Sequence, residues 1–434
     1  MAASSSNIAT EGVFSILDTD MYKLTMQCAV QKYYPQTYVT YTYTNRTPSM
    51  KLNKKAFQWL QTQVNGLSSI ALTEEEYKYL KTNCPFLNAE YLDYLKGFRF
   101  RPEEHVSLTF DDEQNSQDSR GGLICNVRGM WLETILYEIP LLALTSEAYF
   151  RFIDTDWDYE GQEESAHQKG RDLLDYKIAF SEFGTRRRRS YQAQDLVLQG
   201  LSRAARDVHQ GRFVGSSNVH FAMKYGVMPV GTVAHEWFMG TAASMDNYMD
   251  STEKALQRWV RTFGDGVLGI ALTDTFGTPA FLEAFARPMP FGDKTYAQSF
   301  AGVRQDSGDP EEFINIMRSF YDKHGIGKKT IIFSDSLNVE KSKKYHDMAI
   351  EKGFYPSFGI GTFFTNDFHH KSNREKSKPL NIVIKLSSAN GNYAVKLSDE
   401  SGKNTGDAAT VRRAKEAFDY KDKHWDEADE AARW

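Results

Sequence analysis

Hydrophobic and polar positions follow two patterns along the chain, and the first occupies its middle part. Between residues 171 and 369, helical patterns alternate with short apolar segments that predict strands. The predicted strands are residues 218–222, 228–233, 267–272, 301–304, 330–334 and 357–360. Repeated strand and helix units of this spacing favour a parallel sheet, either open or closed into a barrel. In both architectures the chemistry lies beyond the carboxyl ends of the strands.

The second pattern, an alternation of apolar and polar residues, is found near both ends of the chain. Residues 380–398 form two such runs joined by Asn390-Gly391, which is the strongest local signal for a hairpin. Residues 38–44, YVTYTYT, are aromatic and rich in Thr. We therefore expect a second domain, built from both chain ends around a mainly antiparallel sheet. Residues 414–434 are helical in period and heavily charged, which predicts a surface helix or a mobile tail.

The composition is that of a globular protein with more than one domain. A chain of 434 residues, 41% of them hydrophobic, predicts two domains or a barrel with an appended domain. The formal net charge of −5 argues against a polyanion-binding protein, so any anion site must be local. Cys28, Cys84 and Cys125 stand far apart without a CxxC pair, so neither a disulfide framework nor a zinc ribbon is indicated, and a reducing compartment is expected.

The sequence predicts neither a targeting peptide nor a membrane span. The start of the chain has no cationic region followed by an apolar core, so we expect residues 1–11 to be a disordered tail. Residues 130–150 are apolar but contain Pro140 and three glutamates, which favours a pair of soluble helices over a span of about 20 apolar residues. The expected location is the cytoplasm, with the nucleus left open, and no partner among membranes or nucleic acids.

The run GTVAHEW at residues 231–237 places His235 just beyond a Gly-Thr turn that follows an apolar segment. A neutral imidazole in such a place can act as a nucleophile, a general base or a ligand near pH 7. A zinc protease helix would need a second histidine four residues later, where the chain has Met239. Asp274 follows a predicted strand in the same way. Its carboxylate could orient the imidazole as the third element of a triad, or it could cap a helix.

Two further turns follow predicted strands and suit anions. Gly359, Gly361 and Thr362 form a Gly-x-Gly-Thr turn whose backbone N–H groups could hold a phosphate, although such turns are also common without a ligand. Arg304 and Asp306 lie in a polar turn, where an arginine suits a carboxylate or phosphate, and Asp suits sugar hydroxyls or Mg²⁺. Asp309, at the end of that turn, is predicted to cap the helix that follows rather than to bind a ligand.

A cluster of aromatic and basic residues occupies FSEFGTRRRR at residues 180–189. An aromatic face beside guanidinium groups suits a flat, anionic heterocycle. The same cluster could be a nuclear signal or a nucleic-acid patch, which the negative net charge makes a minor alternative. Two of the four arginines are expected to be solvated on the helix that follows.

Taken together, the motifs resemble the nicotinate phosphoribosyltransferase family over nearly the whole chain. They are DTDMYKLTM at 18–26, FSEFGTRRR at 180–188, GTVAHEWFMG at 231–240, VRQDSGDP at 303–310, FSDSLN at 333–338, GIGTFFTNDF at 359–368 and KLSSANG at 385–391. The resemblance implies synthesis of nicotinate mononucleotide and diphosphate from nicotinate and 5-phosphoribosyl 1-diphosphate, in the salvage of nicotinate for NAD, with coupled ATP hydrolysis. Mg²⁺ would accompany the phosphorylated substrates and be held mainly by their phosphates, with no protein ligands assigned.

The resemblance also implies an architecture. It is an irregular α/β barrel beside a smaller α/β sandwich domain. On this chain the barrel would span residues 151–369, and the sandwich domain would combine residues 12–150 with residues 370–434. The resemblance leaves open a homodimer with a shared active site, in which Tyr22 comes from the neighbouring subunit.

Site roles follow from the same resemblance, position by position. His235 would be the transiently phosphorylated histidine, oriented by Asp274. Tyr22 and Phe183 would sandwich the pyridine ring. The remaining roles are Arg304 and Thr232 for the nicotinate side, Asp335 for the ribose, and Arg186, Asp306, Gly308, Gly359, Gly361 and Thr362 for the phosphoribosyl part.

Nicotinamide-using relatives carry an aspartate in the strand before the active histidine, where this chain has Ser217 and Asn218. An aspartate would repel a carboxylate, whereas Ser217 or Asn218 can donate a hydrogen bond to one, which favours nicotinate. A nicotinamide phosphoribosyltransferase remains the alternative enzyme. A basic-patch nucleic-acid binder remains the alternative that is not an enzyme.

Overall fold

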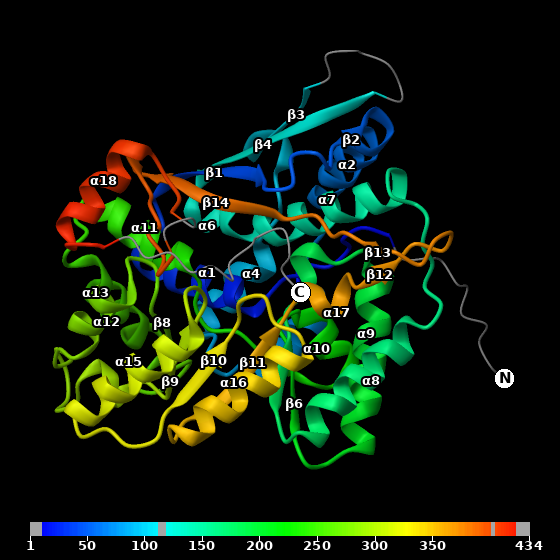
Figure 1. The fold of residues 1–434 in the computed structure, drawn as a ribbon. Helices are drawn as coiled ribbons and strands as arrows, with labels where there is room; N and C mark the ends of the chain where they lie inside the picture. The colour runs from blue at the N-terminus through cyan, green and yellow to red at the C-terminus, as the bar shows by residue number, and fades with distance from the viewer. Residues whose placement is uncertain (1–10, 112–118, 401–403, 422–434) are drawn as a thin grey trace.

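The computed structural model describes residues 11–111, 119–400 and 404–421. They form two main sheets, with helices packed around and between them (Figure 1). In this view the antiparallel sheet lies at the top and the parallel sheet below it. In the same view α8 (Gln162–Asp175) and α9 (Tyr191–Asp207) lie to the right of the parallel strands, and α12 (Ser251–Phe263) lies to their left.

The parallel sheet has seven strands in the order β7-β6-β5-β11-β10-β9-β8, curled into a half-barrel. Every neighbouring pair is parallel, and among the described residues β7 and β8 at the two ends do not pair. The strands are β5 (Ala179–Glu182), β6 (Arg212–Ser216), β7 (Met228–Pro229), β8 (Ile270–Leu272), β9 (Gly302–Gln305), β10 (Thr330–Phe333) and β11 (Tyr355–Ile360). The predicted alternation of strands and helices is therefore confirmed as an open, curled sheet.

One predicted strand is wrong. Residues 218–222 begin helix α10 (Val219–Tyr225), because the Asn218 side chain caps it by accepting from the Phe221 backbone N–H at 3.1 Å, and Gly226 ends it. The strand of this unit is β6, which precedes it. Strands β5 and β6 are only four and five residues long and were not predicted.

The antiparallel sheet joins the two ends of the chain, as the alternating runs predicted. Strand β14 pairs with β1 along its length, with Val39 opposite Ala389. Asn390 and Gly391 have φ of 49° and 85°, the left-handed values that a two-residue hairpin turn requires. The strands are β1 (Tyr38–Asn45), β2 (Leu52–Asn53), β3 (Val106–Asp111), β4 (Arg120–Met130), β14 (Ile382–Ala389) and β15 (Asn392–Tyr393). A separate two-stranded hairpin consists of β12 (Phe368–His369) and β13 (Lys376–Ser377).

Helices of the first 152 residues pack near the antiparallel sheet. Residues 131–152 fold as three helical segments, the longest of 15 residues, and no helix in the described part of the chain is long and apolar enough to cross a membrane. These elements are α1 (Met21–Tyr33), α2 (Lys54–Gly66), η1 (Leu67–Ser69), α3 (Glu74–Asn83), α4 (Ala89–Gly97), α5 (Pro102–His105), α6 (Trp131–Thr134), η2 (Ile135–Tyr137) and α7 (Glu138–Phe152).

The later helices follow strands of the parallel sheet or close the chain. Asp309 caps α15 by accepting from the backbone N–H groups of Glu311 and Glu312, which confirms the predicted cap. These elements are η3 (Thr185–Arg187), α11 (His235–Met245), α13 (Thr278–Phe285), α14 (Tyr296–Ser299), α15 (Pro310–Lys323), α16 (Val339–Glu351), α17 (Thr362–Thr365) and α18 (Ala408–Ala417). The predicted domain boundaries stay a prediction. Residues 1–10 of the predicted tail and residues 422–434 lie outside the described residues.

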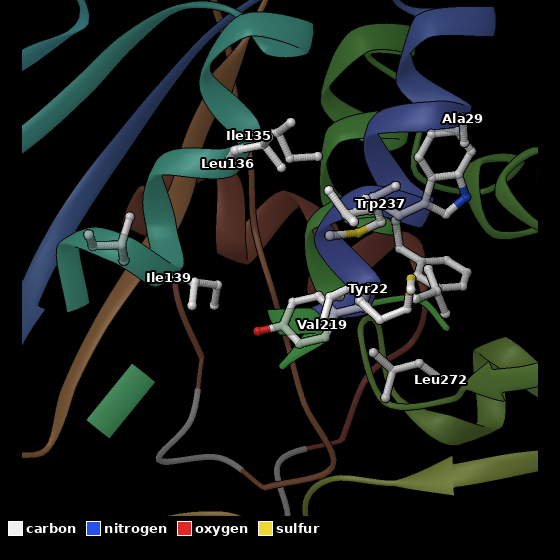
Figure 2. Close-up of a cluster of buried hydrophobic side chains, with 14 of the residues drawn as sticks. Tyr22, Ala29, Ile135, Leu136, Ile139, Val219, Trp237 and Leu272 are labelled. Carbon is white, nitrogen blue, oxygen red and sulfur yellow. The ribbon is translucent and has the colours of Figure 1, made fainter. Parts of the chain in front are cut away.

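A buried apolar cluster joins the first helix to the parallel sheet (Figure 2). Tyr22 and Ala29 from α1 lie beside Trp237 from α11 and Leu272 from β8, and Trp237 and Ala29 are fully buried. The hydroxyl of Tyr22 points away from this cluster (Figure 2). Burying an aromatic side chain contributes about 1.5–3 kcal/mol, so the cluster fixes α11, and hence His235 at its start, against α1.

Candidate active site

A cavity of about 350 Å³ lies between the two sheets. One wall is made by residues at and beyond the carboxyl ends of the parallel strands, and the other by residues 383–386 of β14. This is the edge at which α/β sheets and barrels bind ligands, so the cavity lies where the sequence predicts the site. A cavity of this size suits a small molecule.

Most of the predicted site residues line this cavity. They are Tyr22, Phe183, Arg186, Thr232, His235, Arg304, Asp306, Asp335, Gly359, Gly361 and Thr362. Ser217, Asp274 and Gly308 are outside the lining. Gly308 has φ of 74° and faces Asp399, so its role is in the turn rather than in the cavity wall.

Tyr22 and Phe183 reach the cavity from the same chain. The turn at Gly231 packs against the start of α1, where an added Cβ would lie only 2.9 Å from the backbone nitrogen of Tyr22. The Phe183 ring packs on Gly359, whose added Cβ would lie 3.3 Å from it. Both aromatic residues of the predicted ring site therefore line one cavity of a single chain.

Two arginines supply positive charge to the cavity. Arg186 lies in η3, directly after β5, and its Nη1 is 3.8 Å from Glu138. Arg304 lies in β9, with Nη2 3.3 Å from Asp306 Oδ1 and Nη1 donating to the Val233 carbonyl at 3.3 Å. The Nε of Arg304 is buried without a hydrogen-bond partner among the described residues. The Arg304 side chain is 20% exposed and lines the cavity, so its guanidinium can meet an anionic ligand there.

Ser217 does not occupy the position expected for it. Its side chain is fully buried, and its hydroxyl donates to Asp20 Oδ1 at 2.7 Å. Asn218 is also buried, and it donates to Asp18 at 2.7 Å. The predicted direct contact of either side chain with a substrate carboxylate is therefore wrong, because both donors are already used inside the protein. Asp20 is the carboxylate that reaches the cavity here.

His235 is the first residue of α11, rather than the last residue of a strand. Its Nδ1 lies 3.0 Å from the hydroxyl of Thr275, and its Nε2 lies 2.9 Å from Asp306 Oδ2. Lys396 Nζ also lies 2.9 Å from Nε2. A neutral imidazole carries one proton, so Nε2 either donates to Asp306 or accepts from Lys396. In the second arrangement Nδ1–H donates to Thr275.

Asp274 lies near the imidazole without the predicted hydrogen bond to its second nitrogen. Its Oδ1 is 3.7 Å from Nε2, and the other oxygen accepts from the Ser307 hydroxyl at 2.6 Å. Asp306 and Thr275 are the direct partners of the ring in its place. Although burial alone would raise the pKa of Asp274, Lys396 and His235 hold that pKa below its ordinary value, so the carboxylate stays charged.

His235, Asp274 and Asp306 are the one group among the described residues with the composition and spacing of a metal site. The position between them is taken by the ammonium of Lys396, 2.9 Å from His235 Nε2 and 3.3 Å from Asp274 Oδ2. The group therefore does not fit a resident metal ion, because a divalent cation beside the ammonium would be repelled.

Burial, reinforced by the positive charge of Lys396, lowers the pKa of His235 from 6.5 to about 4. Asp274 and Asp306 oppose this shift without cancelling it. Lowering the pKa of a histidine keeps it neutral, so we expect the imidazole of the free protein to stay unprotonated down to about pH 5. NMR titration of ¹³C-labelled histidine, with His235→Asn to assign the signal, measures this pKa. A midpoint near 6.5 would contradict it.

A buried charged network lies beneath the cavity. Lys23 is fully buried, with Nζ 2.5 Å from Glu138 Oε2 and in contact with Glu236. Glu236 also accepts from the Tyr41 hydroxyl at 2.6 Å and from the Trp131 indole at 2.8 Å. Since Glu236 follows His235 and Glu138 lies near Arg186, this network ties together two sides of the cavity.

The four consecutive arginines do not form a basic surface. Arg188 and Arg189 are both fully buried, whereas Arg186 and Arg187 are partly exposed, so at most these two can be the solvated pair that was expected. Arg188 forms a bidentate pair with Asp18, at 2.8 Å for each oxygen, and Arg189 bonds Asn366 at 2.9 Å. Arg186 and Arg187 line the cavity. No run of exposed arginines is thus left for a nucleic-acid patch at this segment.

The sequence reasoning missed several charged residues of the cavity. They are Asp20, Arg46, Glu138, Glu236, Lys385 and Lys396. Lys396 had a signal in the sequence, because it interrupts the apolar run AVKL. A lysine that is buried within an apolar run is usually paired with an opposite charge inside the protein.

Comparison with known proteins agrees with this geometry. The chain matches the models of the nicotinate phosphoribosyltransferase (NAPRTase) family over residues 178–422 and of its N-terminal domain over residues 17–146. It is 49% identical to the nicotinate phosphoribosyltransferase of Saccharomyces cerevisiae, covering 97% of this chain and 98% of that protein. It is 41% identical to that of Methanosarcina mazei, covering 92% and 97%.

Solved structures give the same result. The fold is similar to a crystal structure of a putative nicotinate phosphoribosyltransferase from Saccharomyces cerevisiae, with a TM-score of 0.91, 48% identity and coverage of 95% of this chain and 100% of that one. It is also similar to the Vibrio cholerae nicotinate phosphoribosyltransferase, with a TM-score of 0.83, 31% identity and coverage of 95% of each chain. Sequence, fold and cavity together show that this chain belongs to the nicotinate phosphoribosyltransferase family.

Proposed function

We propose that the protein forms nicotinate mononucleotide and diphosphate from nicotinate and 5-phosphoribosyl 1-diphosphate, in the salvage of nicotinate for NAD. The observation that carries the proposal is one cavity that joins two aromatic residues, two arginines and a glycine-rich turn at the ends of parallel strands. The names of the relatives support the same reaction.

The pyridine ring would lie between Tyr22 and Phe183, which offers aromatic stacking of about 0.5–1.5 kcal/mol beyond the area buried. Arg304 would hold the carboxylate through its guanidinium, and Thr232 also lines the cavity. A charge-assisted hydrogen bond is about twice as strong as a neutral one, so the anionic base is favoured over its amide.

The phosphoribosyl group would lie along the ends of β9, β10 and β11. Arg186 and the backbone of the Gly359–Gly361–Thr362 turn would take the phosphate, while Asp306 and Asp335 would reach the ribose side. Helix α17, which follows the turn, is only four residues long, so backbone N–H groups and the Thr362 hydroxyl carry the binding rather than a long helix dipole. Bond exchange at the anomeric carbon is loose and cation-like, so positioning dominates catalysis.

We further propose that ATP hydrolysis is coupled through His235. The lone pair of Nε2 attacks the γ-phosphorus, the N–P bond forms, and the bond to the bridging oxygen breaks with its electron pair leaving on ADP. Water later cleaves the N–P bond, which releases phosphate and restores the imidazole. The neutral imidazole described above supports this role, because a protonated ring has no lone pair to offer at Nε2.

Mg²⁺ is proposed to arrive with the substrate phosphates. When bound it would neutralise phosphate charge. The His235, Asp274 and Asp306 group already holds the Lys396 ammonium, so no protein cage is assigned to the ion. A cytoplasmic location, the coupling ratio of ATP and a homodimer remain proposals of the same kind. Tyr22 and Phe183 line one cavity within one chain.

A comparison of nicotinate with nicotinamide tests the proposed substrate. We expect kcat/KM to favour nicotinate by about 10- to 100-fold, since a hydrogen bond to a charged group contributes about 1.5–3 kcal/mol. Arg304→Gln should lower this preference, and Lys32→Met, an exposed position near the end of α1 and outside the cavity lining, should leave it unchanged. Equal or better turnover of nicotinamide by the wild type would make the protein a nicotinamide phosphoribosyltransferase instead.

A further inference from the structure

Lys396 is a charged residue close to the reacting nitrogen of His235. It belongs to none of the sequence motifs, and the family resemblance assigns it no role. It follows the β14–β15 hairpin, 161 residues from His235, and its Nζ lies 2.9 Å from His235 Nε2. The ammonium also lies 3.3 Å from Asp274 Oδ2. Its side chain is only 8% exposed and reaches the cavity.

The backbone around Lys396 holds the side chain in place. Lys396 and Thr405 exchange two backbone hydrogen bonds, each 2.9 Å long. The next residue, Leu397, donates to the Thr275 carbonyl at 2.8 Å, so this segment is joined to the loop that carries Asp274 and Thr275. The lysine and both side-chain neighbours of the imidazole ring are therefore fixed relative to one another.

Charge balance shows what the ammonium does at this position. Two carboxylates, Asp274 and Asp306, face the imidazole, and Lys396 and Arg304 are the cations that face them. A phosphoryl group on Nε2 adds about two negative charges beside Asp306, which lies 2.9 Å from that nitrogen. Without a cation in contact, this group would be strongly repelled at such a low-dielectric site.

Before the reaction, the same ammonium is hydrogen-bonded to the nucleophilic nitrogen of His235. When Lys396 donates to Nε2, the lone pair that must attack phosphorus is in use. An arriving γ-phosphoryl group offers anionic oxygens, which are stronger acceptors than a neutral imidazole nitrogen. The ammonium can therefore pass from the nitrogen to a phosphoryl oxygen over a short distance, and this frees the lone pair.

We infer that Lys396 is a catalytic residue of the phosphoryl-transfer step: its ammonium holds Nε2 of His235 in the free protein and pairs with the phosphoryl oxygens once the N–P bond forms. The inference rests on the proposed phosphorylation of His235. No proton is transferred by Lys396; it exchanges one hydrogen-bond acceptor for another, while the electron pair of the broken P–O bond leaves with ADP. Lys396 thus stabilises charge in the transition state rather than only binding ATP.

Rapid-quench labelling with γ-labelled ATP tests this role in Lys396→Met, Lys396→Gln and Lys396→Arg. At saturating ATP we expect the rate of phosphoprotein formation to fall about 100-fold or more in the Met and Gln variants, the usual loss for one transition-state donor. The Arg variant should recover part of the rate, because it keeps the charge. The Kd for ATP, measured separately, should change by less than about 10-fold. Lys32→Met, the same substitution at an exposed lysine, should label like the wild type.

The outcomes separate the two proposals. A wild-type protein that takes up no label would overturn the phosphorylation of His235 itself. A labelled wild type with Lys396→Gln labelling at the wild-type rate would overturn the role of Lys396. The same holds if the loss lies entirely in the Kd for ATP with an unchanged rate at saturation. The Gln variant keeps a polar side chain of similar size, so it decides the question if Lys396→Met does not fold.

Discussion

Replacing His235 by alanine is expected to abolish the acid-labile labelling of the protein by γ-labelled ATP. Alanine has no lone pair where Nε2 of the imidazole stands, and among the described residues no second histidine lines the cavity. The part of nucleotide formation that depends on ATP should be lost together with the label. Phosphoprotein recovered after a short incubation, with and without acid treatment, measures this effect.

His105→Ala is the matched control for this experiment. His105 is also buried, but it lies outside the cavity lining, with Nδ1 3.4 Å from the Tyr137 hydroxyl. The control variant should take up label as the wild type does. Equal labelling of His235→Ala and wild type would remove the proposed phosphoryl carrier, whatever the nucleotide-forming activity turns out to be.

Lys23→Met is expected to lower the free energy of unfolding by about 3–5 kcal/mol, the usual result of removing one partner from a buried ion pair. Lys23 is fully buried between Glu138 and Glu236, and these two carboxylates hold its pKa above the ordinary value although burial opposes this. Methionine keeps the length of the side chain but leaves both carboxylates without their cation. Urea denaturation followed by fluorescence measures the change.

The surface pair of Lys96 and Glu74 provides the control for this substitution. Both side chains are more than half exposed, and exposed pairs contribute little, so Lys96→Met should unfold at nearly the wild-type urea concentration. A triple variant with Lys23→Met, Glu138→Gln and Glu236→Gln should regain part of the lost stability, because no buried charge is then unpaired. A Lys23→Met protein with the wild-type midpoint would show that the network does not stabilise the fold.

The features of the fold that could be predicted are those encoded by neighbouring residues. Asn390-Gly391 determines its turn through two left-handed φ values, and Asp309-Pro310 determines the start of α15. The failure at residues 218–222 has a local cause as well. Val219 and Phe221 are buried as strand residues would be, but the cap at Asn218 decides in favour of a helix.

The residues of the candidate site could be predicted where a single motif contains them. The prediction failed for pairs of residues that lie far apart along the chain. Each motif placed its own side chain near a strand end, because that position follows from the order of the elements. The partner of His235 is Asp306, 71 residues later, and Lys396 is 161 residues later. Ser217 was placed wrongly for the same reason, since Asp20, 197 residues earlier, takes its hydroxyl. No local pattern records such pairs.

The pairing of β1 with β14 also sets the order in which the protein can fold on the ribosome. Thr40 meets Ser388 across 348 residues, so β1 is made long before the strand that covers its edge. At about 5–20 residues per second, the interval is roughly 20–70 s. During this time the uncharged strand YVTYTYTN has one edge open to other chains, which is the situation that favours aggregation. Protection of this strand edge until β14 has been made would therefore favour correct folding of the chain.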